Sequence, residues 1–90
     1  MPKISKTFKI QNHLGLHARA AAQFVKISSR FKSEVLVQKG SREVNGKSIM
    51  GILTLGAAKG STISVHTIGD DAEAAMTELG QLIDEKFGEK

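Results

Sequence analysis

The chain has 90 residues and a formal net charge of +4, and it contains no Cys, Trp or Tyr. This length suits one small domain with a modest core, so we expect a single domain over residues 1–90. The lack of Cys excludes a disulfide framework and any thiolate metal site. No apolar run approaches the roughly 20 residues of a membrane span, so we expect no membrane insertion. The basic N-terminus lacks a signal-peptide core, which favours the cytoplasm.

Charge is divided unevenly along the chain. Residues 1–47 carry ten Lys/Arg and two acidic residues, whereas residues 48–90 carry three and seven. A basic half attracts acidic partners, which include protein surfaces and nucleic acid. Few side chains are available to stack on bases. We therefore expect no nucleic-acid partner, although nucleic-acid binding stays open as an alternative with strongly salt-dependent affinity.

Hydrophobic alternation predicts strands. They cover residues 4–10, 34–39, 42–45 and 61–68, with a tight turn between the second and the third.

Helical spacing predicts three helices. The first covers residues 17–30, a brief second one follows Ser48 and ends near Gly56, and a long third one continues to Phe87. Asp70 and Glu73 predict a capping-box-like start for the third helix. This element order predicts an α+β fold in which helices cover one face of a mainly antiparallel sheet.

The stretch GLHARAAA at residues 15–22 begins a helix without Ser, Thr, Asp or Asn at its start. Its first-turn N–H groups are then free, at the positive end of the helix dipole. A neutral His17 offers a nucleophilic lone pair, and Arg19 follows two residues later. This setting suits a phosphoryl group on His17. The alternative is an exposed histidine beside a solvated polar stripe.

Other uses of the histidines and serines are less well supported. His13 and His17 are four residues apart, but no Asp, Glu or Cys lies close by in the sequence to complete a metal site, so we expect none. Hydrolytic catalysis by Ser28, Ser29 or Ser48 lacks an evident orienting carboxylate. His66 is expected to be a residue of the sheet.

GLHARAA, followed about thirty residues later by NGKSIMGILTLG, a strand and a helix with an acidic start, resembles the HPr family of histidine phosphocarriers. The resemblance covers nearly the whole chain. It implies an open-faced β-sandwich, in which a four-stranded antiparallel sheet carries three helices on one face in the order β-α-β-β-α-β-α.

The resemblance also implies a function. His17 would accept a phosphoryl group on Nδ1 from enzyme I of the phosphoenolpyruvate phosphotransferase system and pass it to an enzyme IIA-type acceptor. Arg19 would neutralise phosphoryl charge, and the backbone N–H groups of Ala18 and Arg19 would bind it. The protein would be a carrier without a cofactor, a phosphoryl-transfer intermediate and not a turnover enzyme.

Ser48 matches the family's regulatory serine, which the resemblance implies is phosphorylated by HPr kinase/phosphorylase. A phosphoserine at a helix N-terminus is favoured by the dipole, and its charge disfavours docking of an acidic surface. Two alternatives stay open. Ser48 is a plain N-cap, or the protein is a regulatory binding module that acts through Ser48 without phosphorelay through His17.

The short helix is more apolar than a small surface helix requires, so we expect a partner-docking surface on a monomeric protein. Its expected residues are Ile49, Met50 and Leu53, ringed by Arg19, Lys26 and Lys47.

The chain departs from the family pattern near His17. Ala20 stands where the family usually has proline, which restores an N–H donor. Leu14 lacks the polar side chain of many members, so any hydrogen bond that fixes the tautomer of His17 must come from elsewhere. The lead-in Asn12-x-Leu14-Gly15 resembles the nitrogen-related branch, whereas residues 47–51 resemble the kinase-regulated branch.

Overall fold

The computed structural model describes residues 1–89, which form four strands and three helices followed by a short 3₁₀ turn. The strands are β1 (Lys3–Lys9), β2 (Glu34–Lys39), β3 (Arg42–Asn45) and β4 (Thr62–Ile68). The helices are α1 (Ala18–Ser28), α2 (Ile49–Thr54) and α3 (Ala72–Asp84), and the turn η1 is Lys86–Gly88.

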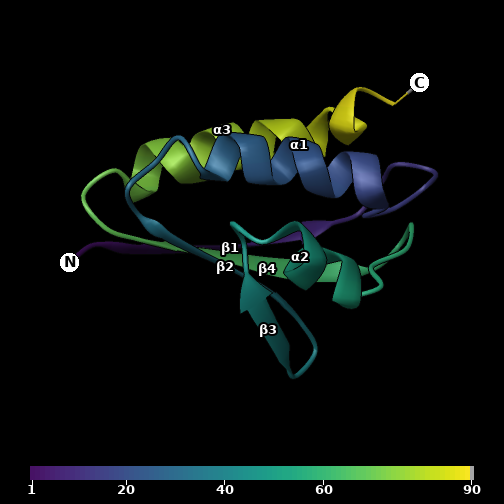
Figure 1. Cartoon of the computed structure of the whole chain (residues 1–90), viewed down its shortest axis with the longest axis horizontal. Helices are drawn as coiled ribbons and strands as arrows, with labels where there is room; N and C mark the ends of the chain where they lie inside the picture. The colour runs from purple at the N-terminus through teal and green to yellow at the C-terminus, as the bar shows by residue number, and fades with distance from the viewer. Residues whose placement is uncertain (90) are drawn as a thin grey trace.

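The sheet is antiparallel throughout, with the strand order β1-β4-β2-β3. Helices α1 and α3 run side by side over one face of the sheet (Figure 1), and α2 packs against α1 and β3. On the open face, His66 contacts Ser5 through Nδ1 (2.7 Å) and Gln38 through Nε2 (3.2 Å). The structure confirms the predicted open-faced α+β sandwich and the place of His66 in the sheet.

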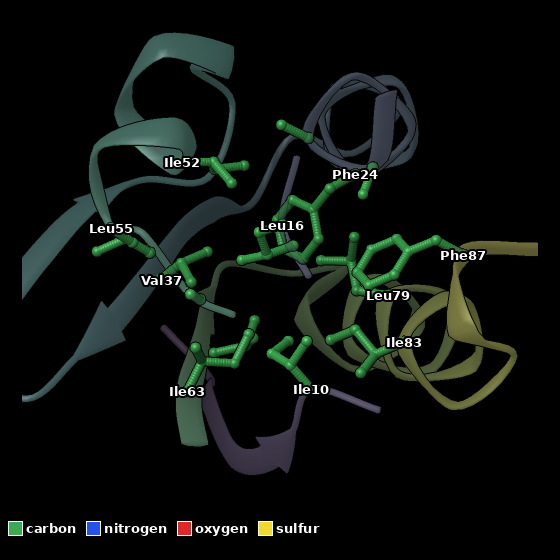
Figure 2. Packing of buried hydrophobic residues seen from close by; sticks show 14 of the residues in the cluster. Ile10, Leu16, Phe24, Val37, Ile52, Leu55, Ile63, Leu79, Ile83 and Phe87 are labelled. Atoms are coloured by element: carbon green, nitrogen blue, oxygen red, sulfur yellow. The ribbon is translucent and has the colours of Figure 1, made fainter. Parts of the chain in front are cut away.

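The core lies between the sheet and the helices (Figure 2). Alternation along β2 and β4 directs Val37 and Ile63 inward, where both are about 1% exposed. Phe24 of α1 and Ile52 of α2 are buried to the same degree. Burial of each such side chain contributes roughly 1.5–3 kcal/mol. This packing fixes α1 on the sheet and thereby fixes the position of its first turn.

The predicted capping box of α3 is wrong. The N-cap residue is Asp71, not Asp70, and its side chain makes no cap hydrogen bond. The carboxylate instead accepts the N–H groups of Lys32 and Ser33, each at 2.9 Å, and the Ser33 hydroxyl. Asp71 therefore connects the start of α3 to the segment between α1 and β2. These hydrogen bonds lower the pKa of Asp71, and the bond from the Ser33 hydroxyl has the largest effect.

The prediction of a helix through Phe87 is also wrong, because α3 ends at Asp84. Lys86 and Phe87 have φ angles of +58° and +56°, so the chain turns back and Phe87 packs into the core, 5% exposed. The C-terminal segment thereby reaches the end of the molecule where α1 begins (Figure 1). Within residues 1–89, no helix has the length and apolar character needed to cross a membrane.

Candidate functional site

The first turn of α1 is open, as the sequence predicts. His17 is the N-cap residue, with extended φ and ψ of −76° and 178°, and its side chain makes no cap hydrogen bond. The first intrahelical bond runs from Ala21 N to His17 O (2.9 Å). The N–H groups of Ala18, Arg19 and Ala20 precede this bond and face the helix end. N–H groups at such a helix start favour a negatively charged group beside them.

The turn before His17 is tightly packed. Gly15 has a φ of +65°, and its N–H donates to Asn12 O (3.2 Å), while Leu16 N donates to Ala57 O (2.8 Å). A Cβ at position 15 would stand 2.5 Å from Ala57 O. Glycine is therefore required for the close approach that places His17 at the helix start.

His17 and Arg19 share a hollow of about 220 Å³ with Gln23 and the C-terminal residues Phe87 to Glu89. The His17 side chain is 30% exposed, so the ring is accessible. The Gln23 Oε1 atom is buried and has no hydrogen-bond partner among the described residues. The predicted pair of His17 and Arg19 thus lies in one concave site.

Glu89 is a charged residue of this site that the sequence prediction did not include. Its Oε2 atom lies 3.6 Å from His17 Nε2 and accepts a hydrogen bond from Asn12 Nδ2 (3.1 Å). Its Oε1 atom accepts the Leu14 N–H (2.9 Å). The Asn12 side chain first, then the backbone donors and the charge of His17, lower the pKa of Glu89 against the opposing effect of desolvation. The carboxylate is therefore ionised at neutral pH.

Ser48 is the N-cap residue of α2, and its Oγ accepts the Gly51 N–H at 3.0 Å. Next to it, Ile49 is 40% and Met50 71% exposed. Leu53 is partly buried and packs against the core. Leu14, which the sequence prediction did not include, is 62% exposed on the rim of the His17 hollow.

The predicted cations differ in their surroundings. Arg19 and Lys26 are exposed on α1. Lys47 is half-buried, and its Nζ donates to the carbonyl of Phe31 (2.7 Å), which follows α1. No group of three or more metal-ligating side chains occurs within the described part of the chain.

Fold and site together define a small open-faced sandwich with an accessible histidine at a helix N-terminus that lacks a side-chain cap. Residues 4–85 match the family described as PTS HPr component phosphorylation site. The chain belongs to the HPr family, the phosphocarriers of the phosphotransferase system.

Relatives resemble the chain over its full length. It is 50% identical to the phosphocarrier protein HPr of Neisseria meningitidis serogroup A over 96% of this chain and 97% of that protein. A crystal structure of HPr-C-His from Thermoanaerobacter tengcongensis superposes with a TM-score of 0.91 at 46% identity, covering 100% of this chain and 99% of that one. A structure of an HPr dimer from the same organism has a TM-score of 0.78 at 48% identity, with 91% and 94% covered.

Proposed function

We propose that His17 carries the phosphoryl group. It takes the group on Nδ1 from phosphorylated enzyme I and passes it to an enzyme IIA-type acceptor. The observation that carries the proposal is the exposed imidazole at a helix start whose first N–H groups are outside the helical hydrogen-bond ladder. Such a terminus stabilises the phosphoryl charge without holding it permanently.

Arg19 supplies the mobile positive charge of this site. It projects from the first turn of α1 into the hollow that contains His17. A guanidinium can contact two phosphoryl oxygens at once and balance the charge that develops during in-line transfer. The N–H groups of Ala18 and Arg19 bind the same oxygens, and Ala20 adds a third donor where the family usually has proline.

The test is the intact mass of the protein after incubation with phosphoenolpyruvate and enzyme I. One acid-labile phosphate on the wild type, absent from His17→Ala, supports the proposal. His13→Ala is the matched control, because His13 is exposed in the preceding turn. No uptake with an enzyme I that is active on another carrier would contradict phosphorelay and favour a regulatory module acting through Ser48.

Regulation at Ser48 is a second part of the proposal. A phosphoryl group on Oγ would lie at the start of α2, and Gly51 leaves room there, since a Cβ at that position would stand 3.3 Å from Ser48 Oγ. Incubation with ATP and HPr kinase/phosphorylase is expected to add one acid-stable phosphate that Ser48→Ala lacks. If the kinase adds no phosphate, the regulatory role is contradicted and Ser48 serves only as the N-cap of α2.

Docking of enzyme I and of the acceptor would use Ile49, Met50 and Leu53 with the cations Arg19, Lys26 and Lys47. Ile49 and Met50 support this because their apolar side chains face solvent. Met50→Ser is expected to weaken transfer while leaving stability unchanged, and Thr62→Ser is an exposed control on the sheet.

We expect a cytoplasmic monomer, and light scattering distinguishes it from a dimer such as that of the T. tengcongensis relative.

A further inference from the structure

We propose that the Glu89 carboxylate holds a proton on His17 Nε2, which keeps Nδ1 free for the phosphoryl group and makes the departing imidazole neutral. The proposal rests on the phosphocarrier role of His17 and extends it. Glu89 would be a positioning residue, because it acts through His17 and does not touch the phosphoryl group.

The carboxylate of Glu89 faces Nε2, the His17 ring nitrogen that is left free when the phosphoryl group is on Nδ1. Glu89 Oε2 lies 3.6 Å from His17 Nε2. This distance exceeds a hydrogen bond, but of the two neutral tautomers of the ring the carboxylate favours the one whose N–H faces it, which is Nε2–H. The proton on one ring nitrogen leaves the lone pair on the other. Nδ1 is then the nucleophile in the resting protein.

The carboxylate is fixed before any reaction occurs. Leu14 N–H binds Oε1, and Asn12 Nδ2 binds Oε2, at 2.9 and 3.1 Å. Asn12 is itself 1% exposed, and its Nδ2 also donates to Gly15 O at 2.7 Å. Phe87 anchors the segment on the core just before Glu89. A charge held in this way needs little rearrangement when the ring changes its charge.

Two opposite charges are kept apart in the hollow. Within residues 1–89, Glu89 pairs with His17, and no ion pair joins Glu89 to Arg19. Arg19 therefore stays available for the phosphoryl oxygens, while Glu89 acts on the ring proton. His13 contributes only its backbone to the surroundings of the carboxylate.

The proton matters most when the phosphoryl group leaves. Once phosphorus is bound to Nδ1, Nε2 is the only ring nitrogen that can carry a proton. During transfer, the P–Nδ1 bond breaks, its electron pair stays on Nδ1, and a neutral nitrogen of the acceptor supplies the pair for the new bond. With the proton kept on Nε2, the product is neutral imidazole. Without it, the leaving group would be an imidazolate anion, which is a much poorer leaving group.

The test compares Glu89→Ala and Glu89→Gln with Glu85→Gln. Glu85 is exposed one turn earlier, where it accepts a hydrogen bond from Gln81, and it does not line the hollow. The first readout is the protonation of each His17 ring nitrogen, from ¹⁵N NMR of the unphosphorylated protein at a pH where the ring is neutral. We expect the Nε2–H form in the wild type and in Glu85→Gln, and a larger Nδ1–H population in Glu89→Ala.

The second readout is the rate of phosphoryl transfer in both directions between enzyme I and the carrier. Both Glu89 variants are expected to transfer the phosphoryl group about tenfold or more slowly than the wild type. Side chains that position a proton in a reaction typically contribute at least this much to its rate. Unchanged tautomer populations in Glu89→Ala, wild-type rates in both variants, or an equal loss in Glu85→Gln would overturn the proposal. Glu89→Gln keeps an oxygen for Leu14 N–H, so it decides the kinetics if Glu89→Ala loosens the C-terminal segment. A wild type that takes no phosphate refutes the phosphocarrier role, and the NMR result still decides the role of Glu89.

Discussion

Asn12 and Glu89 are 77 residues apart in the chain and are joined by a hydrogen bond of 3.1 Å from Nδ2 to Oε2. The same nitrogen donates to Gly15 O at 2.7 Å. One buried amide therefore connects the C-terminal segment to the turn that presents His17. The geometry of the site depends on this residue, although Asn12 does not line the hollow itself.

Asn12→Ala is expected to lower the free energy of unfolding by about 1–3 kcal/mol, because the buried carbonyl of Gly15 loses its side-chain donor. Urea denaturation measures this loss, and hydrogen exchange at Leu14 N–H should become faster as Glu89 is released. Gln11→Ala is the control, because Gln11 directly precedes Asn12 and its side chain is exposed. A loss no larger than that of the control would show that water replaces Asn12 without cost.

Gly15→Ala and Gly56→Ala form a matched pair, because the two glycines have φ angles of +65° and +59°. The left-handed conformation costs about 1–2 kcal/mol at each position. Only position 15 adds a collision, since its Cβ would stand 2.5 Å from Ala57 O, whereas nothing lies within 4 Å at position 56. Displacing this backbone adds about 1–3 kcal/mol. Equal losses of stability in the two variants would contradict this packing argument.

Acid should weaken the contact of Asp71 with the Ser33 and Lys32 segment. The hydrogen bonds, led by that of the Ser33 hydroxyl, lower the pKa of Asp71 below its ordinary value of 3.8. A lowered folded-state pKa means that the stabilisation is complete above the unfolded-state value and is lost as the pH falls through the folded-state value. Asp71→Asn should therefore be less stable than the wild type at pH 7, and this difference should shrink below about pH 4.

Urea titrations between pH 7 and pH 2.5 measure this difference. Asp70→Asn is the control, because the Asp70 side chain is exposed and makes no hydrogen bond within residues 1–89. A difference between the wild type and Asp71→Asn that stays constant over this range would contradict the assignment.

The sequence predicts the fold well because the fold depends on local patterns. Val35 and Val37 alternate in β2, and the apolar positions of α1 recur at helical spacing, so each element carries its own signal. The start of α3 was predicted wrongly for a specific reason. Both Asp70 and Asp71 are good cap residues by type, and the choice between them follows from the position of Ser33, 38 residues earlier.

The site was predicted in part for a related reason. His17 and Arg19 belong to one helix turn, so their proximity follows from the sequence. Glu89 reaches His17 only because Lys86 and Phe87 adopt positive φ angles and reverse the chain. The sequence does not predict this conformation, because Lys and Phe seldom adopt positive φ angles. The packing of Phe87 in the core stabilises it, and that packing exists only in the folded protein.

Ser48 permits a test that separates its structural role from a regulatory one. Its Oγ caps α2 by accepting the Gly51 N–H, so Ser48→Ala should lower the free energy of unfolding by about 0.5–2 kcal/mol. Ser48→Asp keeps an acceptor for the cap hydrogen bond, so its free energy of unfolding should be close to that of the wild type. Ser29→Ala is the control, because Ser29 is exposed at the end of α1.

Binding then distinguishes the two roles. If charge at this position regulates docking, Ser48→Asp should bind an acidic acceptor more weakly than either the wild type or Ser48→Ala, as measured by calorimetry at low salt. The added carboxylate repels an acidic surface beside Ile49 and Met50, and salt screens this repulsion, so the difference should shrink as the ionic strength rises. If Ser48→Asp bound like the wild type at every salt concentration, the serine would act through its cap alone.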